Sequence, residues 1–294
     1  MAIARGGYPS LVAHHGQTTW AFFPLFPAAM HVLGWLGMPL WFGGVVISHV
    51  AFLVALVGLH RLVARRCSPR AAYLATWLLA LFPAAFVFSL VYPSSLFLAA
   101  SVWAFVLVDE HRDLAAGVVT AGATLTRPNG IVVAVALAFA VGFVMPRLRR
   151  VCGPSILVLS GWLAFNWAKT GNLLKFLDSK WAWREVTVFG VGGRYLGTAL
   201  FHLALAAIAL GVVVAAARHI PRSWKVLTGL SLLPSLVLGI VGLARYANEC
   251  FPPFAAAGQL LERRGHRTVT AVFTALVVGQ VLFAVWIIAL RHLP

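Results

Sequence analysis

Apolar residues dominate this chain in long runs, which short polar or proline-containing segments separate. A run of about 20 apolar residues can cross the hydrocarbon core of a bilayer as a helix. The runs cover residues 40–59, 70–89, 94–108, 114–126, 129–145, 151–168, 195–217, 226–243, 250–261 and 268–290. Because lipid offers backbone groups no hydrogen-bond partner, each run is expected to be a helix. The pattern predicts an all-α, polytopic transmembrane bundle of about 8–10 membrane helices.

The composition agrees with this pattern. Apolar residues make up 61% of the chain and charged residues 10%, whereas soluble domains carry about 25% charged residues. The chain contains no internal repeat, low-complexity segment or linker, so we expect one membrane-embedded domain over residues 1–294. Within it, residues 1–38 form an external loop with interfacial helices, and residues 39–294 form the bundle, which carries a second external loop at 169–194.

Basic residues fall in four short clusters between the apolar runs. The clusters are Arg61, Arg65, Arg66 and Arg70; Arg147, Arg149 and Arg150; Arg218, Arg222 and Lys225; and Arg263, Arg264 and Arg267. The positive-inside rule places all four on the cytoplasmic side. The net charge of +16 forms no aromatic-interleaved patch, so we expect no nucleic acid as partner, and anionic lipid headgroups instead. Residues 1–38, 169–194 and 244–251, with Tyr92–Ser95 and Thr126–Gly130, then lie outside.

The external loop 169–194 combines charged side chains with two tryptophans. It contains Lys175, Asp178, Lys180, Arg184 and Glu185 together with Trp181 and Trp183. Aromatic rings stack on sugar faces and cations bind phosphates, so this composition suits a charged glycolipid. A belt of tryptophan at the level of the lipid headgroups, with solvated charges, explains it equally well. Both interpretations remain open at this point.

The first external segment is too interrupted by proline to cross a membrane. Residues 20–37 are expected to form short interfacial helices that provide one wall of a groove for a lipid. His14 and His15 precede this segment, and adjacent histidines are a poor metal signal. We expect one of them to hydrogen-bond a substrate. Three cysteines without a Cys-x-x-Cys pair indicate neither a disulfide framework nor a zinc site. No cofactor is predicted, although a divalent metal remains open.

Four outward segments resemble a known family. They read "IARGGYPS…HHGQTTWAFFPLFP", "FPAAFVFSLVYPSSLF", "ATLTRPNGIVV" and "ARYANECFPPF". In this order they resemble the PIG-V-type (GPI mannosyltransferase-like) integral membrane glycosyltransferases of the GT-C class, over nearly the whole chain. The resemblance implies a GT-C fold and an inverting mannosyltransferase. It would transfer a hexose from polyprenyl-phosphate-mannose to a glycan or glycolipid acceptor on the extracytoplasmic face. The Ala-, Val- and Arg-rich composition favours a bacterial plasma membrane.

The chain departs from the family pattern at two carboxylates. A Trp-Asp pair, which follows a first transmembrane helix, precedes the first motif in the family, and this chain begins after that point. We therefore expect either a misassigned start or a lost first span. Ser94 stands where the family has Glu in Tyr-x-Glu. The family's catalytic Asp is thus missing, and the catalytic residue is unknown.

Sugar transfer with inversion needs a carboxylate to accept the proton of the acceptor hydroxyl, and cationic groups to hold the leaving phosphate. The external carboxylates Asp178, Glu185 and Glu249 are weak candidates for the base. An ion pair with Arg245 is the structural alternative for Glu249. Candidate substrate-binding residues are Arg127, Arg245, Arg184, Trp181, Trp183, His14, His15 and Tyr92.

These candidates also have structural interpretations. Arg127 lies in "TLTRPNG", where Pro128 and Gly130 break the chain between two apolar runs. An arginine so close to apolar spans is costly without a partner, although it could also cap a helix end and reach the interface. Tyr92 could instead belong to the belt of aromatic side chains at the membrane–water interface. If the hypothesis is right, Arg127 and Arg245 face one shared pocket near the Phe-Phe-Pro segment.

Two functions without chemistry compete with a transferase. One is a membrane transporter, although transporters tend to show internal repeats and ionisable residues at mid-membrane depth. The other is a non-catalytic subunit that binds a glycolipid for a partner protein. The missing catalytic Asp keeps this second alternative open.

Overall fold

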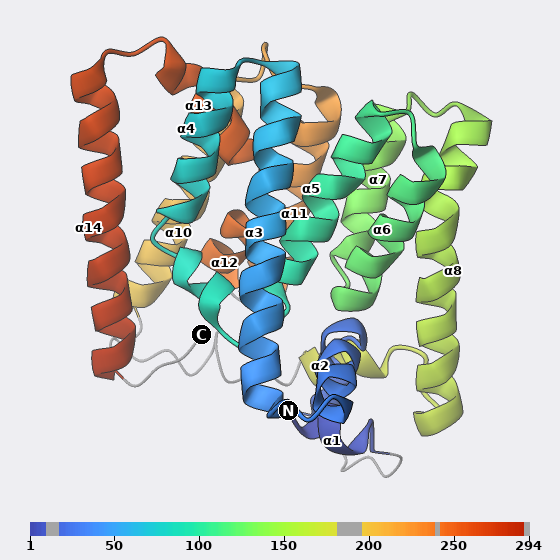
Figure 1. The fold of residues 1–294 in the computed structure, drawn as a ribbon. Coiled ribbons are helices and arrows are strands. Elements are labelled where there is room, and N and C mark those ends of the chain that lie inside the picture. Colours follow the sequence, from blue (N-terminus) through green and yellow to red (C-terminus); the bar gives the residue numbers. More distant parts are fainter. Residues whose placement is uncertain (10–17, 181–195, 239–241, 291–294) are drawn as a thin grey trace.

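The computed structural model describes residues 1–9, 18–180, 196–238 and 242–290, and every regular element in these ranges is helical (Figure 1). The α-helices are α1 (Ala2–Gly6), α2 (Leu25–Trp35), α3 (Leu40–Arg66), α4 (Pro69–Ala80), α5 (Ser94–Asp109), α6 (Asp113–Thr126), α7 (Gly130–Ala140), α8 (Met145–Thr170), α10 (Leu196–Ala215), α11 (Arg222–Leu238), α12 (Leu243–Asn248), α13 (Pro252–Glu262) and α14 (His266–Leu290). Two 3-10 helices, η1 (Thr19–Ala21) and η2 (Ala85–Ser89), and a helical segment from residue 175 to the last described residue before the gap, 180, accompany them. The all-α class is confirmed.

Three helices are long and apolar enough to cross a membrane. They are α3, α8 and α14, the last over His266–Trp286. The exposed surface of α14 includes Val277, Val281, Leu282 and Val285, as expected for a helix that faces lipid. The apolar helices α2, α5, α6 and α7 have between 10 and 17 residues. The structure is therefore consistent with a membrane protein that contains both long and shorter apolar helices.

The prediction of one helix over residues 70–89 was wrong. Helix α4 ends at Ala80, and the chain resumes as the short helix η2. Pro83 explains the break, because proline lacks a backbone N–H and its ring clashes with the carbonyl group four residues earlier, that of Leu79. Apolar content alone does not reveal such a break. As a result, the segment that leads to Tyr92 folds back toward the interior of the molecule.

The turn between α6 and α7 places Arg127 inside the fold. Helix α6 stops at Thr126, and Arg127 has an extended backbone, which is the conformation favoured before a proline. A Cβ atom on Gly130 would lie 2.2 Å from the Cα atom of Thr124, so only glycine permits this close return of the chain. Figure 1 shows the turn at mid-height, with α1 and α2 below it.

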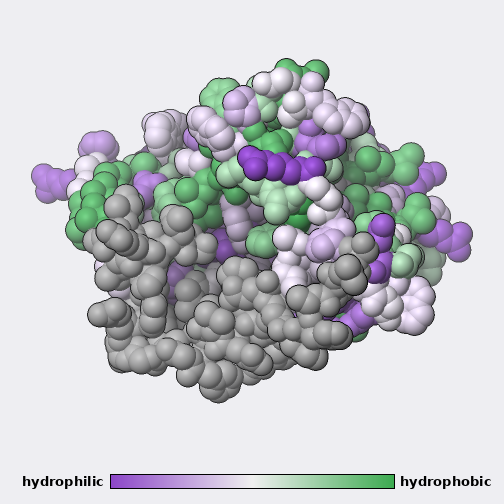
Figure 2. All heavy atoms as spheres, turned by 90° about the horizontal axis from the view of Figure 1, so that it is seen from below, coloured by the Kyte–Doolittle hydropathy of each residue, from purple (hydrophilic) through white to green (hydrophobic). Residues whose placement is uncertain are grey.

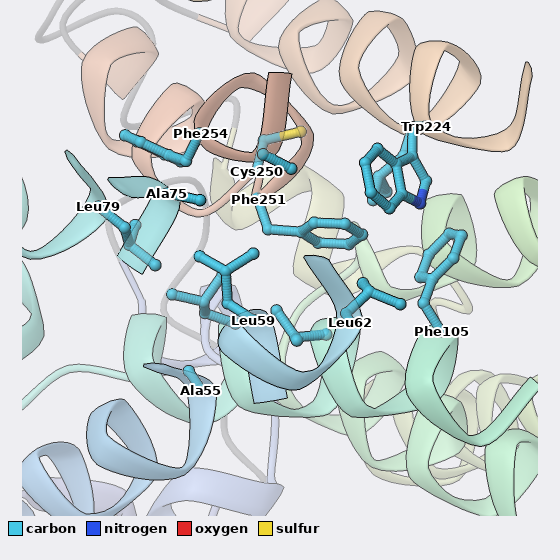
Figure 3. Close-up of a cluster of buried hydrophobic side chains, with 14 of the residues drawn as sticks. Ala55, Leu59, Leu62, Ala75, Leu79, Phe105, Trp224, Cys250, Phe251 and Phe254 are labelled. Carbon is cyan, nitrogen blue, oxygen red and sulfur yellow. The ribbon is translucent and has the colours of Figure 1, made fainter. Parts of the chain in front are cut away.

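A hydrophobic core fills the space between α3, α4, α5, α11 and α13 (Figure 3). Phe251, at the start of α13, is completely buried. Its ring packs edge-on against Phe105 of α5 and Trp224 of α11, with centroids 5.2 and 5.5 Å apart. This packing anchors the chain two residues after Glu249. The core therefore sets the position of a polar group in the candidate site.

The four basic clusters meet at one end of the molecule, which we call the basic end. Arg66 makes a two-pronged contact with Asp109, and Arg147 donates to both oxygens of Asp113 at 2.8 Å. Arg70 donates to the backbone carbonyl of Arg264 at 3.4 Å. These contacts tie α3 to α5, α8 to α6, and α4 to the turn before α14. The N-terminus lies at the other end, which we call the opposite end (Figure 1).

Close packing of α6 on α8 gives a first testable prediction. A Cβ atom on Gly117 would lie 2.0 Å from the backbone oxygen of Arg150, whereas one on Gly153 would meet nothing within 4 Å. Gly117→Ala is expected to lower the free energy of unfolding by about 1–3 kcal/mol through overpacking. Gly153→Ala, the control, should raise it by about 0.5–1 kcal/mol, because alanine favours a helix. Unfolding in detergent measures both, and equal stabilities would contradict the α6–α8 contact.

Candidate functional site

Two arginines from distant parts of the chain lie against the same tyrosine ring. The guanidinium carbon of Arg127 is 4.9 Å from the ring centroid of Tyr92, and that of Arg245 is 5.0 Å from it. The two guanidinium groups are therefore no more than about 10 Å apart. The ring face attracts both cations and neutralises neither. The structure thus brings Arg127, Arg245 and Tyr92 together, as the sequence hypothesis required.

Glu249 forms a buried ion pair with Arg127. One carboxylate oxygen accepts from Nη1 of Arg127, and the other accepts from the hydroxyl of Ser94 at 2.5 Å. The Ser94 hydroxyl also accepts from Nη2 of Arg127 at 3.0 Å. Arg127 is 7% exposed and Glu249 is 3% exposed. A buried ion pair is tolerated when further hydrogen bonds complete it, and Ser94 supplies them here.

This contact corrects one expectation and qualifies another. The expected ion-pair partner of Glu249 was Arg245, but the structure shows that it is Arg127. Ser94 stands where the resembled family has a glutamate, yet a carboxylate reaches the same place from Glu249. The serine hydroxyl is short and can both donate and accept. It therefore joins the two charged groups.

The segments that carry Ser94 and Glu249 are held in place by hydrogen bonds to backbone groups of neighbouring elements. Asn248, which is completely buried, donates to the carbonyl of Ala84 at 3.0 Å. Ser95 donates to the carbonyl of Phe88 at 3.0 Å. The backbone N–H of Ala244 donates to Nδ1 of His202 at 3.2 Å. These bonds attach α12 and the start of α5 to η2 and α10. The segments that carry Glu249 and Ser94 are therefore fixed within the fold.

Lys180 brings a third cation to this group. It is partly buried and is the last described residue of a helical segment that begins at residue 175. It lies close enough to Arg127, Arg245, Tyr92 and Glu249 for their charges to act on it. Burial lowers the pKa of Lys180 to about 8, and the positive charges of Arg127 and Arg245 act in the same direction. We call Arg127, Arg245, Lys180, Glu249 and Tyr92 the cation cluster.

An aromatic cluster adjoins the cation cluster through the segment at residues 175–180, which contains both Phe176 and Lys180. It consists of Tyr8, Trp20, Phe23, Trp162, Phe165 and Phe176. The hydroxyl groups of Thr18 and Ser179 are 2.6 Å apart, and this bond connects the first external segment to the residue before Lys180. The short helices η1 and α2 occur where interfacial helices were predicted. The described side chains on this end mix hydrophobic and hydrophilic residues (Figure 2).

The remaining candidate residues do not join the cation cluster in the described structure. Asp178 is exposed, and its carboxylate accepts from the side chain of Asn172 at 2.5 Å, so we do not place it in the site. His14, His15, Trp181, Trp183, Arg184 and Glu185 lie outside the described residues. Their roles stay predictions.

Sequence reasoning did not select Lys180 or Ser94 as binding residues. The loop 169–194 was noted for its charges and tryptophans, but Arg184 was preferred as its cation. A signal for Lys180 existed in its position directly before Trp181 and Trp183. No pattern in the sequence indicates that Ser94 connects Arg127 to Glu249, because these residues are far apart in the chain.

The arrangement of charges indicates which ligands the site can hold. Three cations and one carboxylate lie together, so the described groups carry an excess of positive charge. Such a site suits an anion with several oxygens, such as a phosphate. Within the described part of the chain, no group of three or more His, Cys, Asp or Glu residues could hold a metal ion. No protein-family model, curated protein or solved structure matches this chain.

Proposed function

We propose that this chain is a polytopic membrane glycosyltransferase of the GT-C class, similar to the PIG-V-type mannosyltransferases. It transfers a hexose, mannose by the resemblance, from a polyprenyl-phosphate donor to a glycan or glycolipid acceptor. The basic end faces the cytoplasm of a bacterium, in line with the positive-inside rule. The cation cluster then lies toward the extracytoplasmic side of the plasma membrane.

One observation carries the proposal: three of the four motifs that resemble the family meet in the cation cluster. Tyr92 and Ser94 come from the second motif, Arg127 from the third, and Arg245 with Glu249 from the fourth. The first motif supplies Thr18, which reaches the neighbourhood of Lys180 through Ser179. Residues that only cap helices or anchor the chain at an interface would not need to converge in this way.

The chemistry of the cluster fits the departure of a lipid phosphate. The acceptor oxygen attacks the anomeric carbon, the bond from this carbon to the phosphate oxygen breaks, and the phosphate leaves with the bonding electrons. Cations placed beforehand around the phosphate stabilise the charge that develops on it. Arg127, Arg245 and Lys180 are the groups of this chain that perform this task, while Tyr92 positions both guanidinium groups.

The proton of the acceptor hydroxyl needs a base. Within the described residues of the cluster, Glu249 is the carboxylate, and both of its oxygens already accept hydrogen bonds. This observation favours one alternative, in which the chain binds the lipid-linked sugar without transferring it.

A transfer assay tests the proposal. Membranes that contain the chain are incubated with radiolabelled polyprenyl-phosphate-mannose, and the label in glycan and glycolipid fractions is counted. We expect transfer by the wild-type chain, and none by a chain with both Arg127→Met and Glu249→Leu. Binding of the labelled donor without transfer would support the non-catalytic alternative. Neither binding nor transfer would refute the proposed function.

A further inference from the structure

An open hollow at the basic end, which we call the arginine hollow, lies between the ends of four helices. Its volume is about 360 Å³. The lining includes Arg65 and Arg66 at the end of α3, Asp109 at the end of α5, Ala140 at the end of α7 and Arg147 near the start of α8. Three arginines from two helices thus surround one space.

One carboxylate beside the arginine hollow is shared by three arginines. The carboxylate oxygens of Glu110 lie 2.6 Å from a nitrogen of Arg61, 3.0 Å from one of Arg65 and 3.9 Å from one of Arg112. The other two arginines of the lining, Arg66 and Arg147, each have a carboxylate of their own. Five arginines thus share three carboxylates, which leaves a surplus of two positive charges.

The surplus does not depend on the parts of the chain outside the described residues. The chain contains seven acidic side chains, and Glu185 is the one that lies outside the described ranges. It offsets at most one positive charge. Arg149 and Arg150, which follow Arg147 closely and are exposed, add two. The hollow is therefore a site for an anion.

The arginines of the lining keep hydrogen-bond donors for a ligand. A guanidinium group has five N–H bonds. Arg66 and Arg147 each use Nε and Nη2 for their carboxylates, and Nη1 of each has no partner among the described residues. Both side chains remain partly exposed, at 30% and 29%. An anion can therefore be bound without breaking either ion pair.

An apolar turn lies between two residues of the lining along the chain. After Ala140 the chain passes through Phe143, Val144 and Met145, which are 54%, 51% and 60% exposed, before it reaches Arg147. The ring of Phe143 packs edge-on against that of Phe139, with centroids 4.9 Å apart. Contiguous exposed apolar residues mark contacts with a membrane or a partner. Arginines beside such a turn suit a ligand that combines a phosphate with acyl chains.

We propose that the arginine hollow binds the phosphate of an anionic phospholipid from the cytoplasmic leaflet, with the apolar turn against its acyl chains. Basic pockets between membrane helices on the cytoplasmic side bind such headgroups. A zwitterionic phospholipid carries the same phosphate together with a cation, which the surplus of positive charge repels. The inference goes beyond the proposed function and does not rest on it, because the hollow contains no residue of the cation cluster.

Two phospholipids test the proposal on the wild-type chain. Dioctanoylphosphatidylglycerol, which is anionic, and dioctanoylphosphatidylcholine, which is neutral overall, are added to the full chain in neutral detergent. Native mass spectrometry measures the bound fraction of each. We expect phosphatidylglycerol to bind at least about tenfold more tightly, because each arginine near an anionic headgroup strengthens binding about fivefold. Equal binding of the two lipids would overturn the proposal.

Two arginines on the same carboxylate provide a matched pair of variants. Arg65 lines the arginine hollow, whereas Arg61 shares Glu110 with it but is not part of the lining. Either substitution by glutamine leaves Glu110 with two arginines, so both variants should fold. Arg65→Gln should weaken phosphatidylglycerol binding about fivefold, and Arg61→Gln by less than about twofold. Equal effects, or no effect of Arg65→Gln, would place the lipid outside the hollow.

A third variant and a soluble ligand separate a lipid from a free phosphate. Phe143 has a left-handed backbone, with a φ of 58°, which asparagine adopts more readily than phenylalanine. Phe143→Asn should therefore keep the fold and weaken both phospholipids, because it removes apolar surface from the turn. Glycerol phosphate, an anion of the headgroup type without acyl chains, should not displace phosphatidylglycerol at equal concentration. Displacement, or unchanged lipid binding in Phe143→Asn, would overturn the assignment to a lipid.

The cation cluster provides the last comparison. Arg127→Met combined with Glu249→Leu should leave phosphatidylglycerol binding unchanged. Loss of binding in this double variant, with none in Arg65→Gln, would place the lipid in the cation cluster and overturn the inference. If sugar transfer fails while Arg65→Gln still weakens phosphatidylglycerol, the inference stands and the proposed function does not.

Discussion

Replacing Glu249 by glutamine is expected to lower the free energy of unfolding by about 3–5 kcal/mol. The change leaves Arg127, which is 7% exposed, without its counter-ion. Removing one partner of a buried ion pair costs this much because the remaining charge stays buried. Denaturation in mixed detergent micelles, followed by tryptophan fluorescence, measures the change.

A double variant separates structure from function at this pair. Arg127→Met combined with Glu249→Leu removes both charges, and apolar residues of similar size often replace a buried ion pair without loss of stability. We expect most of the stability to return and phosphate binding to be lost. Asp178→Asn is the control, since this carboxylate is exposed, and it should change neither property. Wild-type stability in Glu249→Gln would show that the pair is not buried as described.

Replacing Arg245 by glutamine is expected to reduce sugar transfer by about 10²–10³-fold, the typical effect of losing one preformed donor to a developing charge. Its effect on stability should differ from that of Glu249→Gln. In the described structure Arg245 has no ion-pair partner, and it lies near the cations Arg127 and Lys180. Removing it gives up the contacts with the rings of Tyr92 and Tyr246 but leaves no carboxylate unpaired, so the free energy of unfolding should fall by less than in Glu249→Gln.

The measurement for Arg245→Gln pairs the transfer assay with denaturation in detergent. Arg222→Gln, an exposed arginine at the basic end, is the matched control and should retain both transfer and stability. If Arg245→Gln retained full transfer, the cluster would not hold the reacting phosphate. If it lost transfer only together with stability, Arg245 would be a structural residue and not a phosphate ligand.

Most helices could be predicted from the apolar runs, because charged residues and prolines mark the ends of the runs. The run 94–108 became α5 (Ser94–Asp109), and 114–126 became α6 (Asp113–Thr126). The prediction of one helix over 70–89 failed for a physical reason. Hydropathy measures transfer to lipid, whereas Pro83 interrupts the backbone hydrogen bonds of the helix. Which helix ends meet in space depends on packing, such as that of Phe251 against Trp224, and no run of apolar residues contains this information.

The candidate site could be predicted only in part. Arg127, Arg245 and Tyr92 were selected through the family resemblance and the cost of a charge near apolar spans. The pairing of Glu249 with Arg127 could not be foreseen, because these residues are 122 positions apart and two arginines were available. Lys180 likewise lies far along the chain from the other members of the cluster. Such long-range proximity becomes visible only in three dimensions.

The bond between Thr18 and Ser179 has a mechanical consequence. It couples the chain before Trp20 to the residue that precedes Lys180, so a displacement of Thr18 would also shift the Lys180 ammonium group. Sequence changes near the start of the chain should therefore alter the affinity for anions without touching an arginine.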